Sequence, residues 1–309
     1  MTTTVLSYEP NGAFRRLDTR IRSPLRAASW LPDGSAALLA GNRGAVLLFD
    51  RQRFARLPSS TDQNLRGVAW SADGTTALLV GNRGAVLRLR NESLEIIESP
   101  TSENLRRVAW HPDGSYALIV GNAGTILRYE DSRLFPLPGD RAHTLRSVAF
   151  RPDGAYALVG AYASRWAGYP RPQPLYRCDG RFLQALLATD DEDDFVAVDW
   201  RPDGSAALAA GYAWLDGGRV ANKIVIFDGS SFNTLRPESS RMILGAAWHP
   251  SGTHALAAGA GGLLLRCDGQ QVEDIGDESA RENLVGPFWR PDGEQALFII
   301  GPEERVYTV

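Results

Sequence analysis

Four arginines recur at one position of a repeated sequence pattern, where they could bind an anion. Each lies eight residues before the glycine of a short turn: Arg26, Arg66, Arg106 and Arg146. A guanidinium group presents a planar fork of N–H donors that matches a carboxylate or a phosphate. Arg43 and Arg83 would lie nearby if the repeats stack. The alternative is that these arginines are inherited with the repeat and that each pairs with a neighbouring acid.

Two segments rich in tyrosine, tryptophan and arginine form a second candidate site, for a protein or peptide partner. They are residues 161–174 (AYASRWAGYPRPQP) and 212–222 (YAWLDGGRVAN). The side chains that we expect to contact the partner are Tyr162, Arg165, Trp166, Tyr169, Arg171, Tyr212, Trp214 and Asp216. Tyr, Trp and Arg dominate binding hot spots because they combine large contact area with few rotatable bonds or a fixed donor fork. The alternative is that the two segments pack on each other and shield an edge of the fold.

Catalytic and metal-binding patterns are missing from the sequence. The four histidines are His111, His143, His249 and His254, and none belongs to an H-x-x-x-H motif. The Gly-Asn-Arg-Gly segments at Gly41 and Gly81 precede expected strands, whereas a phosphate loop needs a helix behind it. We therefore predict no catalytic residues, no metal and no cofactor, and we expect the histidines at turns, facing solvent.

Composition and charge limit the kinds of partner and the cellular compartment that we expect. The net charge is −3, and residues 190–194 are a run of acids, so a nucleic acid is an unlikely partner. The N-terminal segment lacks the pattern of a signal peptide, and no apolar run is long enough to cross a bilayer. Cys178 and Cys267 occupy one repeat position two units apart, too far to form a disulfide. These features predict a cytoplasmic protein without a membrane partner.

The repeat has a period of about 40 residues and occurs seven times. Its marker is the glycine of a P-D-G-like turn: Gly34, Gly74, Gly114, Gly154, Gly204, Gly252 and Gly293. An aromatic residue lies four positions before each marker: Trp30, Trp70, Trp110, Phe150, Trp200, Trp248 and Trp289. Each unit alternates short apolar runs with Gly, Pro and Asn turns, which is typical of four antiparallel strands. No unit carries the apolar stripe of an amphipathic helix.

Four-stranded units at this period predict an all-β fold, a seven-bladed β-propeller that forms one domain over residues 1–309. The predicted blades are 22–61, 62–101, 102–141, 142–191, 192–239, 240–280, and 281–309 completed by 1–21. The last unit is too short for four strands, so residues 13–17 (AFRRL) are predicted to supply its fourth strand. For its third strand, 5–9 (VLSYE) and 305–309 (RVYTV) compete, and the sequence does not decide between them.

The chain resembles the bacterial WD-repeat and YVTN-like propellers over its whole length. The VAW-x-PDG cores, such as residues 108–114, carry this resemblance. The third strands do not end in a Trp-Asp pair, no Gly-His pair precedes the first strands, and the Asp-box of sialidase-like propellers is absent. The resemblance therefore implies the fold and no active site.

A propeller would bring both candidate sites to one face. The two aromatic segments lie between second and third strands, and the four arginines begin first strands, so all would lie on one rim, with the arginines at the lip of the central channel. We predict a non-catalytic scaffold or adaptor that binds a protein or peptide through the loops of blades four and five. The alternative is a small anionic ligand or glycan, or an enzyme acting on one, at the arginine-lined channel mouth.

Overall fold

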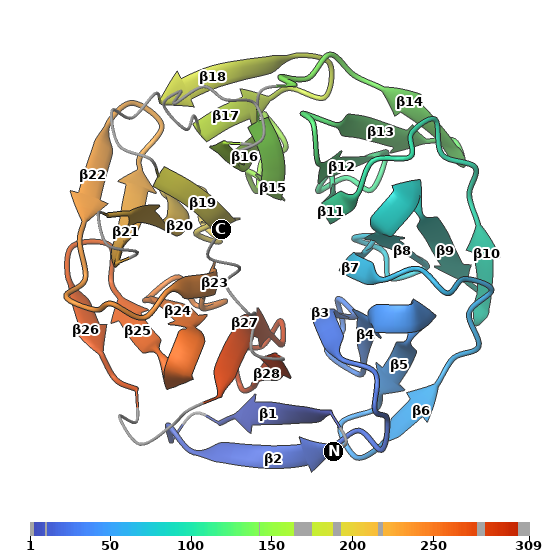
Figure 1. The fold of residues 1–309 in the computed structure, drawn as a ribbon, viewed down its shortest axis with the longest axis horizontal. Helices are drawn as coiled ribbons and strands as arrows, with labels where there is room; N and C mark the ends of the chain where they lie inside the picture. Colours follow the sequence, from blue (N-terminus) through green and yellow to red (C-terminus); the bar gives the residue numbers. More distant parts are fainter. Residues whose placement is uncertain are drawn as a thin grey trace.

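Seven four-stranded antiparallel sheets are arranged in a ring around a central axis, as Figure 1 shows for the computed structural model. The structure describes residues 3–9, 11–141, 143–163, 175–187, 193–215, 219–276 and 282–301. The prediction of an all-β, seven-bladed propeller with four antiparallel strands in each blade is confirmed.

The strands of each blade run from the central axis outward in chain order. Blade one contains β3 (Leu25–Trp30), β4 (Ala37–Gly41), β5 (Val46–Phe49) and β6 (Phe54–Arg56). Blade two contains β7 (Leu65–Trp70), β8 (Thr76–Gly81), β9 (Val86–Arg90) and β10 (Ser93–Ile96). Blade three contains β11 (Leu105–Trp110), β12 (Ala117–Gly121), β13 (Ile126–Glu130) and β14 (Arg133–Pro136). Blade four contains β15 (His143–Phe150), β16 (Ala157–Ala163), β17 (Leu175–Cys178) and β18 (Leu183–Leu187).

The remaining blades follow the same order until the ring closes. Blade five contains β19 (Asp193–Trp200), β20 (Ala207–Trp214), β21 (Val220–Phe227) and β22 (Phe232–Leu235). Blade six contains β23 (Ile243–Trp248), β24 (Ala255–Gly259), β25 (Leu264–Cys267) and β26 (Val272–Asp274). Blade seven contains β27 (Asn283–Trp289) and β28 (Ala296–Gly301) from the end of the chain, then β1 (Thr4–Tyr8) and β2 (Phe14–Asp18) from its start.

The N-terminal hairpin supplies both outer strands of the closing blade. β1 pairs with β28 in the register Val5↔Ile299, and β2 pairs with β1 on the outside. Residues 5–9 therefore take the third position that the sequence left open, and the predicted fourth strand at 13–17 matches β2. Residues 305–309 lie outside the described residues.

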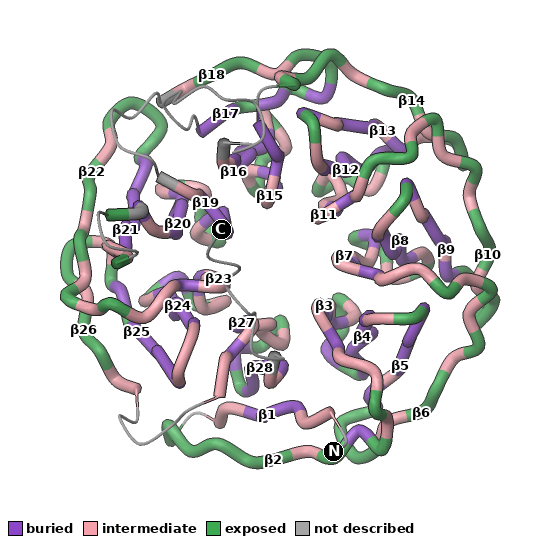
Figure 2. The backbone as a smooth tube through the Cα atoms, viewed as in Figure 1, coloured by how far each residue is buried: buried purple, intermediate pink, exposed green. Residues whose placement is uncertain are grey.

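Burial falls from the middle of each blade to its outer edge (Figure 2). Every residue of β4 is buried, whereas β6 has no buried residue. The second strands read as continuous apolar runs because neighbouring blades cover both of their faces. The outer strands have one face in water, and this explains their weaker sequence pattern.

Apolar clusters between neighbouring blades form the core. One cluster joins Leu208 and Ile224 of blade five to Trp248 of blade six. Two of the repeated tryptophans also bridge blades by hydrogen bonds. The indole Nε1 of Trp30 donates to the carbonyl of Phe288 (3.0 Å), and that of Trp110 donates to the carbonyl of Ala69 (3.1 Å).

Two histidines form a similar link between blades, and the expectation that they face solvent is wrong. The Nε2 atom of His111 lies 3.0 Å from the carbonyl oxygen of Gly154, and its ring stacks on Tyr116 with centroids 4.8 Å apart. In the same way, Nε2 of His249 lies 3.2 Å from the carbonyl oxygen of Gly293. The turn of the next blade covers each ring, a contact that is invisible when each repeat is considered alone.

We expect the stability of the protein to fall between about pH 6.5 and pH 4 because of His254. Burial, helped by His249 and Arg266, lowers the pKa of His254 to about 4. Below pH 6.5 the unfolded chain binds a proton that the folded chain does not, so the free energy of unfolding decreases until pH 4. Each pKa unit corresponds to about 1.4 kcal/mol, and partial exposure of the ring reduces the expected loss to about 1–2 kcal/mol.

Urea denaturation at pH 7 and pH 4.5 measures this loss, with His254→Gln as the comparison. The variant should show a clearly smaller decrease in that interval. Equal decreases in the two proteins would contradict the assignment to His254.

Candidate functional site

One face of the ring carries the four predicted arginines and the described ends of the two aromatic segments, which include Tyr162 and Tyr212. Because strands within a blade are antiparallel, the connections from second to third strands and from each fourth strand to the next blade lie on one face. We call it the insertion face, because the segments 161–174 and 212–222, which make units four and five longer than the others, belong to connections of this kind. It carries the ends of β16 and β20, and the inner strands β3, β7, β11 and β15 begin there (Figure 1). The opposite face carries the P-D-G turns, and we call it the PDG face.

Three of the four predicted arginines are oriented by asparagines of their own blades. The Nε atoms of Arg26 and Arg66 each donate to the side-chain oxygen of an asparagine 16 residues later, Asn42 and Asn82, over 2.5 Å. Arg106 makes the same bond to Asn122 over 2.8 Å. All three are half-buried. The repeat thus gives equivalent guanidinium groups at the insertion-face ends of the inner strands of blades one to three, and we call these three and Arg146 the arginine arc.

Blade four continues the arc with a different partner. Tyr162 occupies the place of the asparagine, and Cζ of Arg146 lies 6.0 Å from the centroid of its ring. A guanidinium at this distance from an aromatic ring is weakly attracted by its negative face. The structure thus brings Tyr162 of the first aromatic segment next to Arg146.

Arg107 adds a fifth guanidinium inside the arc, and sequence analysis missed it. Its Nη1 donates to the carbonyl oxygens of Arg66 (2.6 Å) and Arg106 (3.1 Å). Burial, together with the charges of Arg146 and Arg106, lowers the pKa of Arg107 to about 10. Arg107 is therefore a guanidinium that lies close to those of Arg106 and Arg146.

A signal for Arg107 was available in the repeat. Arg107 lies seven residues before its marker glycine, where the other blades have small residues: Ala27, Gly67, Ser147, Ala197, Gly245 and Gly286. A large charged side chain at a position that elsewhere requires a small one is an exception that could have been found from the alignment of the units.

An acid lies on the inner strand of blade five. Asp199 accepts a hydrogen bond from the backbone N–H of Trp248 over 2.7 Å. Burial raises the pKa of Asp199 to about 6, so the carboxylate is mostly ionised at neutral pH. Asp199 lies next to Trp200 at the PDG-face end of β19, whereas Arg26, Arg66 and Arg106 lie at the insertion-face ends of their inner strands.

The second aromatic segment forms a longer hairpin. β20 and β21 each have eight residues and pair as far as Trp214↔Val220, whereas β12 of blade three has five. Tyr212 is half-buried and packs against the core of blades five and six. Beyond the paired strands, Leu215 is exposed at 43%. The insertion in blade five thus extends two strands and presents an apolar side chain at their end.

The other predicted contact residues are not placed. Arg165, Trp166, Tyr169, Arg171 and Asp216 lie outside the described residues, as do positions 190–192 of the acidic run. The backbone of Trp214 is described, but its side chain is not.

A buried polar cluster beside the first aromatic segment was also missed. The hydroxyl of Tyr176 donates to a carboxylate oxygen of Asp140 (2.9 Å), and Nδ1 of His143 lies 3.1 Å from both of these oxygens. Because the tyrosine proton is used, His143 must carry its proton on Nδ1. Burial and Asp140 both raise the pKa of Tyr176. The cluster ties the connection before β15 to the strand that follows the aromatic segment.

Replacing Tyr176 with phenylalanine should lower the free energy of unfolding by about 1–2 kcal/mol. The change removes the hydroxyl from the buried ring of His143 and from the partly exposed carboxylate of Asp140, and a lost hydrogen bond of this kind typically costs this much. Tyr129→Phe is a matched control, because its hydroxyl has only a long 3.4 Å contact with Arg88. Chemical denaturation should separate the two variants, and equal costs would show that the cluster contributes no special stability.

The described residues contain neither a metal-binding group of side chains nor a membrane-spanning helix. Among them, no three His, Cys, Asp or Glu side chains gather in a group that could hold a metal ion. Within the same part of the chain, no helix has the length and apolar character to span a bilayer.

Comparison with known proteins supports the propeller fold and does not show a family for the chain. No protein-family model matches the sequence, and no curated protein matches it either. Among solved structures, the chain is similar to "YCF48 bound to D1 peptide", with a TM-score of 0.65 and 18% sequence identity. The alignment covers 91% of this chain and 94% of that one. At this identity the likeness shows a shared propeller fold, and membership of the WD-repeat or YVTN-like group stays a prediction.

Proposed function

We propose that the chain is a non-catalytic binding protein that holds a protein segment on the insertion face. The observation that carries this proposal is the asymmetry of that face. Blades one to three have a hydrogen-bonded asparagine after the second strand, whereas blades four and five have Tyr162 and Tyr212 there. Blade five also raises the β20–β21 hairpin, where Leu215 is exposed. Apolar and aromatic side chains on a raised, otherwise polar face are typical of contact surfaces.

Two further points support a protein segment as the ligand. The similar solved structure is described by its title as bound to a peptide. A rigid ring can hold loops of different sequence on a fixed frame, which suits it for binding extended partners. The proposal includes a cytoplasmic setting, in agreement with Cys178 and Cys267, which are buried and not joined to each other.

Affinity capture from the native lysate tests this proposal. The comparison is between the wild type and a Trp166→Ala/Trp214→Ala double variant, with partners identified by mass spectrometry. Phe182→Ala is the matched control, because Phe182 is 65% exposed but lies in a turn on the PDG face of blade four. A partner kept by the wild type and the control but lost by the double variant supports the proposal. A partner kept by all three proteins would contradict it.

A second function is favoured by one observation, the charge around Arg107. Five guanidinium groups near one channel mouth would repel one another less if a carboxylate or phosphate bound between them. This alternative makes the channel mouth a site for a small anionic ligand. It is tested with Arg107→Ser, because Ser147 shows that the repeat accepts serine at this position. Citrate and phosphate should raise the melting temperature of the wild type more than that of the variant. Equal shifts would exclude Arg107 from an anion site.

A further inference from the structure

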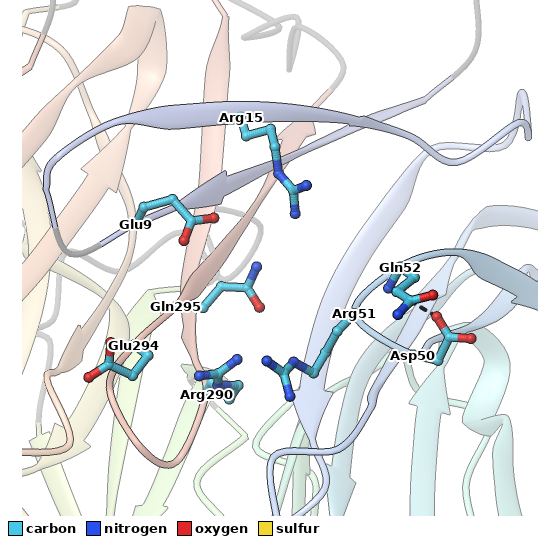
Figure 3. A pocket seen from close by; sticks show the side chains of 8 residues that line it. All are labelled: Glu9, Arg15, Asp50, Arg51, Gln52, Arg290, Glu294 and Gln295. Atoms are coloured by element: carbon cyan, nitrogen blue, oxygen red, sulfur yellow. Dashed lines mark hydrogen bonds between the residues drawn. The ribbon is translucent and has the colours of Figure 1, made fainter.

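A cavity of about 480 Å³ lies on the PDG face where the ring closes (Figure 3). Its wall combines three distant parts of the chain. The β1–β2 hairpin contributes Glu9 and Arg15, the β5–β6 turn contributes Asp50, Arg51 and Gln52, and the β27–β28 turn contributes Arg290, Glu294 and Gln295. A ligand bound there would contact both sides of the seam between blades seven and one.

A buried amide in this wall has an unsatisfied oxygen. Gln295 is 6% exposed, and its Nε2 donates to Oγ of Ser7 over 2.6 Å. Ser7 in turn donates its proton to a carboxylate oxygen of Glu9 over 2.7 Å, so Ser7 can only accept from Gln295. The orientation of the amide is thereby fixed. Its Oε1 is buried and has no hydrogen-bond partner, which is destabilising until a donor arrives.

The charged groups around this oxygen are of both signs. Within the described residues, Arg15 and Arg51 form no ion pair, and Glu294 forms none either. Arg290 is already paired with Asp292, 2.5 Å away. Glu9 accepts the bond from Ser7 and has no ion pair. Figure 3 shows the guanidinium groups of Arg15 and Arg51 directed into the space in front of Gln295.

We propose that this cavity binds a zwitterionic ligand of the free α-amino acid class. A ligand with a net negative charge would be repelled by Glu9 and Glu294, and a cation would be repelled by Arg15 and Arg51. A zwitterion matches both signs. Its carboxylate accepts from Arg15 and Arg51, and its ammonium group donates to Oε1 of Gln295 and to Glu9. The volume that remains accommodates the side chain of the amino acid. The site is on the opposite face from the proposed partner surface and does not depend on it.

Calorimetric titration of the intact protein with each standard L-amino acid at millimolar concentration tests the proposal. At least one should bind with one site per chain. Its N-acetyl derivative lacks the ammonium group and its C-terminal amide lacks the carboxylate, so each should bind about 10-fold or more weakly. Absence of binding by every standard amino acid would overturn the proposal, and so would equal binding of the two derivatives.

Amino-acid substitutions test whether the ligand binds in this cavity. Arg51→Gln is expected to weaken binding of the best amino acid about 10-fold or more, since it removes a charged donor to the carboxylate. Arg133→Gln is the matched control, because Arg133 is an exposed arginine on β14 of blade three and is not part of the wall. Gln295→Met should also weaken binding, and its circular dichroism spectrum reports whether it folds. Binding that survives Arg51→Gln unchanged would exclude this cavity.

Discussion

A chain that lacks residues 1–21 is expected to lose its cooperative unfolding transition and to expose apolar surface. The deletion removes β1 and β2, which are two of the four strands in the closing blade. Phe298 and Ile299 of β28 are fully buried in the intact ring and would lose their cover. The uncovered β28 would also become an open strand edge, which favours aggregation. Chemical denaturation and dye binding compare the deletion with the full chain.

A point substitution tests the same contact without shortening the chain. Val5 is fully buried in β1, so Val5→Asp should lower the free energy of unfolding by about 3–5 kcal/mol because it buries an unpaired charge. Arg16→Ala is the control. Arg16 forms an exposed ion pair with Glu282 at 2.5 Å, and exposed pairs contribute about 0–1 kcal/mol. If the deletion and Val5→Asp both unfold like the full chain, the N-terminal hairpin does not close the ring.

The second large effect is expected from Gly154→Ala, at about 2–4 kcal/mol of lost stability. Gly154 has a φ of +73°, and an added Cβ would lie 2.5 Å from Nε2 of His111 in the preceding blade. The matched control is Gly114→Ala, because Gly114 has a φ of +75° but nothing within 4 Å of an added Cβ. The positive φ alone costs about 1–2 kcal/mol in both variants. The difference between the two therefore measures the contact with His111.

Thermal or urea unfolding of the two alanine variants gives this difference directly. A His111→Ala/Gly154→Ala double variant completes the comparison, since removal of the ring should recover most of the extra cost. Equal costs at Gly154 and Gly114 would show that the histidine contact between the blades is not tight.

Features set by the repeat itself were predictable from the sequence. The marker glycines all have positive φ in the structure, which is why one turn could be recognised seven times. The closing blade was predictable in outline because the last unit lacks residues for four strands. The sequence could not show whether 5–9 or 305–309 forms the third strand of that blade, because two short apolar segments with similar patterns are equally compatible with that position.

Contacts between units could not be predicted in the same way. The ring of His111 meets a carbonyl 43 residues later, and Tyr176 meets Asp140 across 36 residues. Neither pair follows from a local sequence pattern. The His111 contact depends on how blade three packs on blade four, and the Tyr176 contact depends on how the connection before blade four packs on the third strand of that blade. Tyr212 shows a related difficulty. Its residue type suggested an exposed contact, but its position within the extended second strand of blade five, β20, places it partly in the core of blades five and six.

The candidate site was predictable as a location more than as a set of contacts. The four arginines lie in the inner strands β3, β7, β11 and β15, and their use as an anion site stays a prediction. Their asparagine partners were not foreseen, although Asn42, Asn82 and Asn122 recur at one position and could have been matched with them. Arg107 does not recur, because the other six units have small residues at its position in the repeat, and a search for recurring residues therefore does not find it.

Site-specific photocrosslinking in the native cell tests the central claim most directly. A photoreactive amino acid replaces either Leu215, on the insertion face of blade five, or Phe182, on the PDG face of blade four. Both side chains are exposed, at 43% and 65%. A protein adduct that forms from position 215 and is missing from position 182 is the result that we predict. An adduct from position 182 alone, or the same adduct from both positions, would contradict binding on the insertion face.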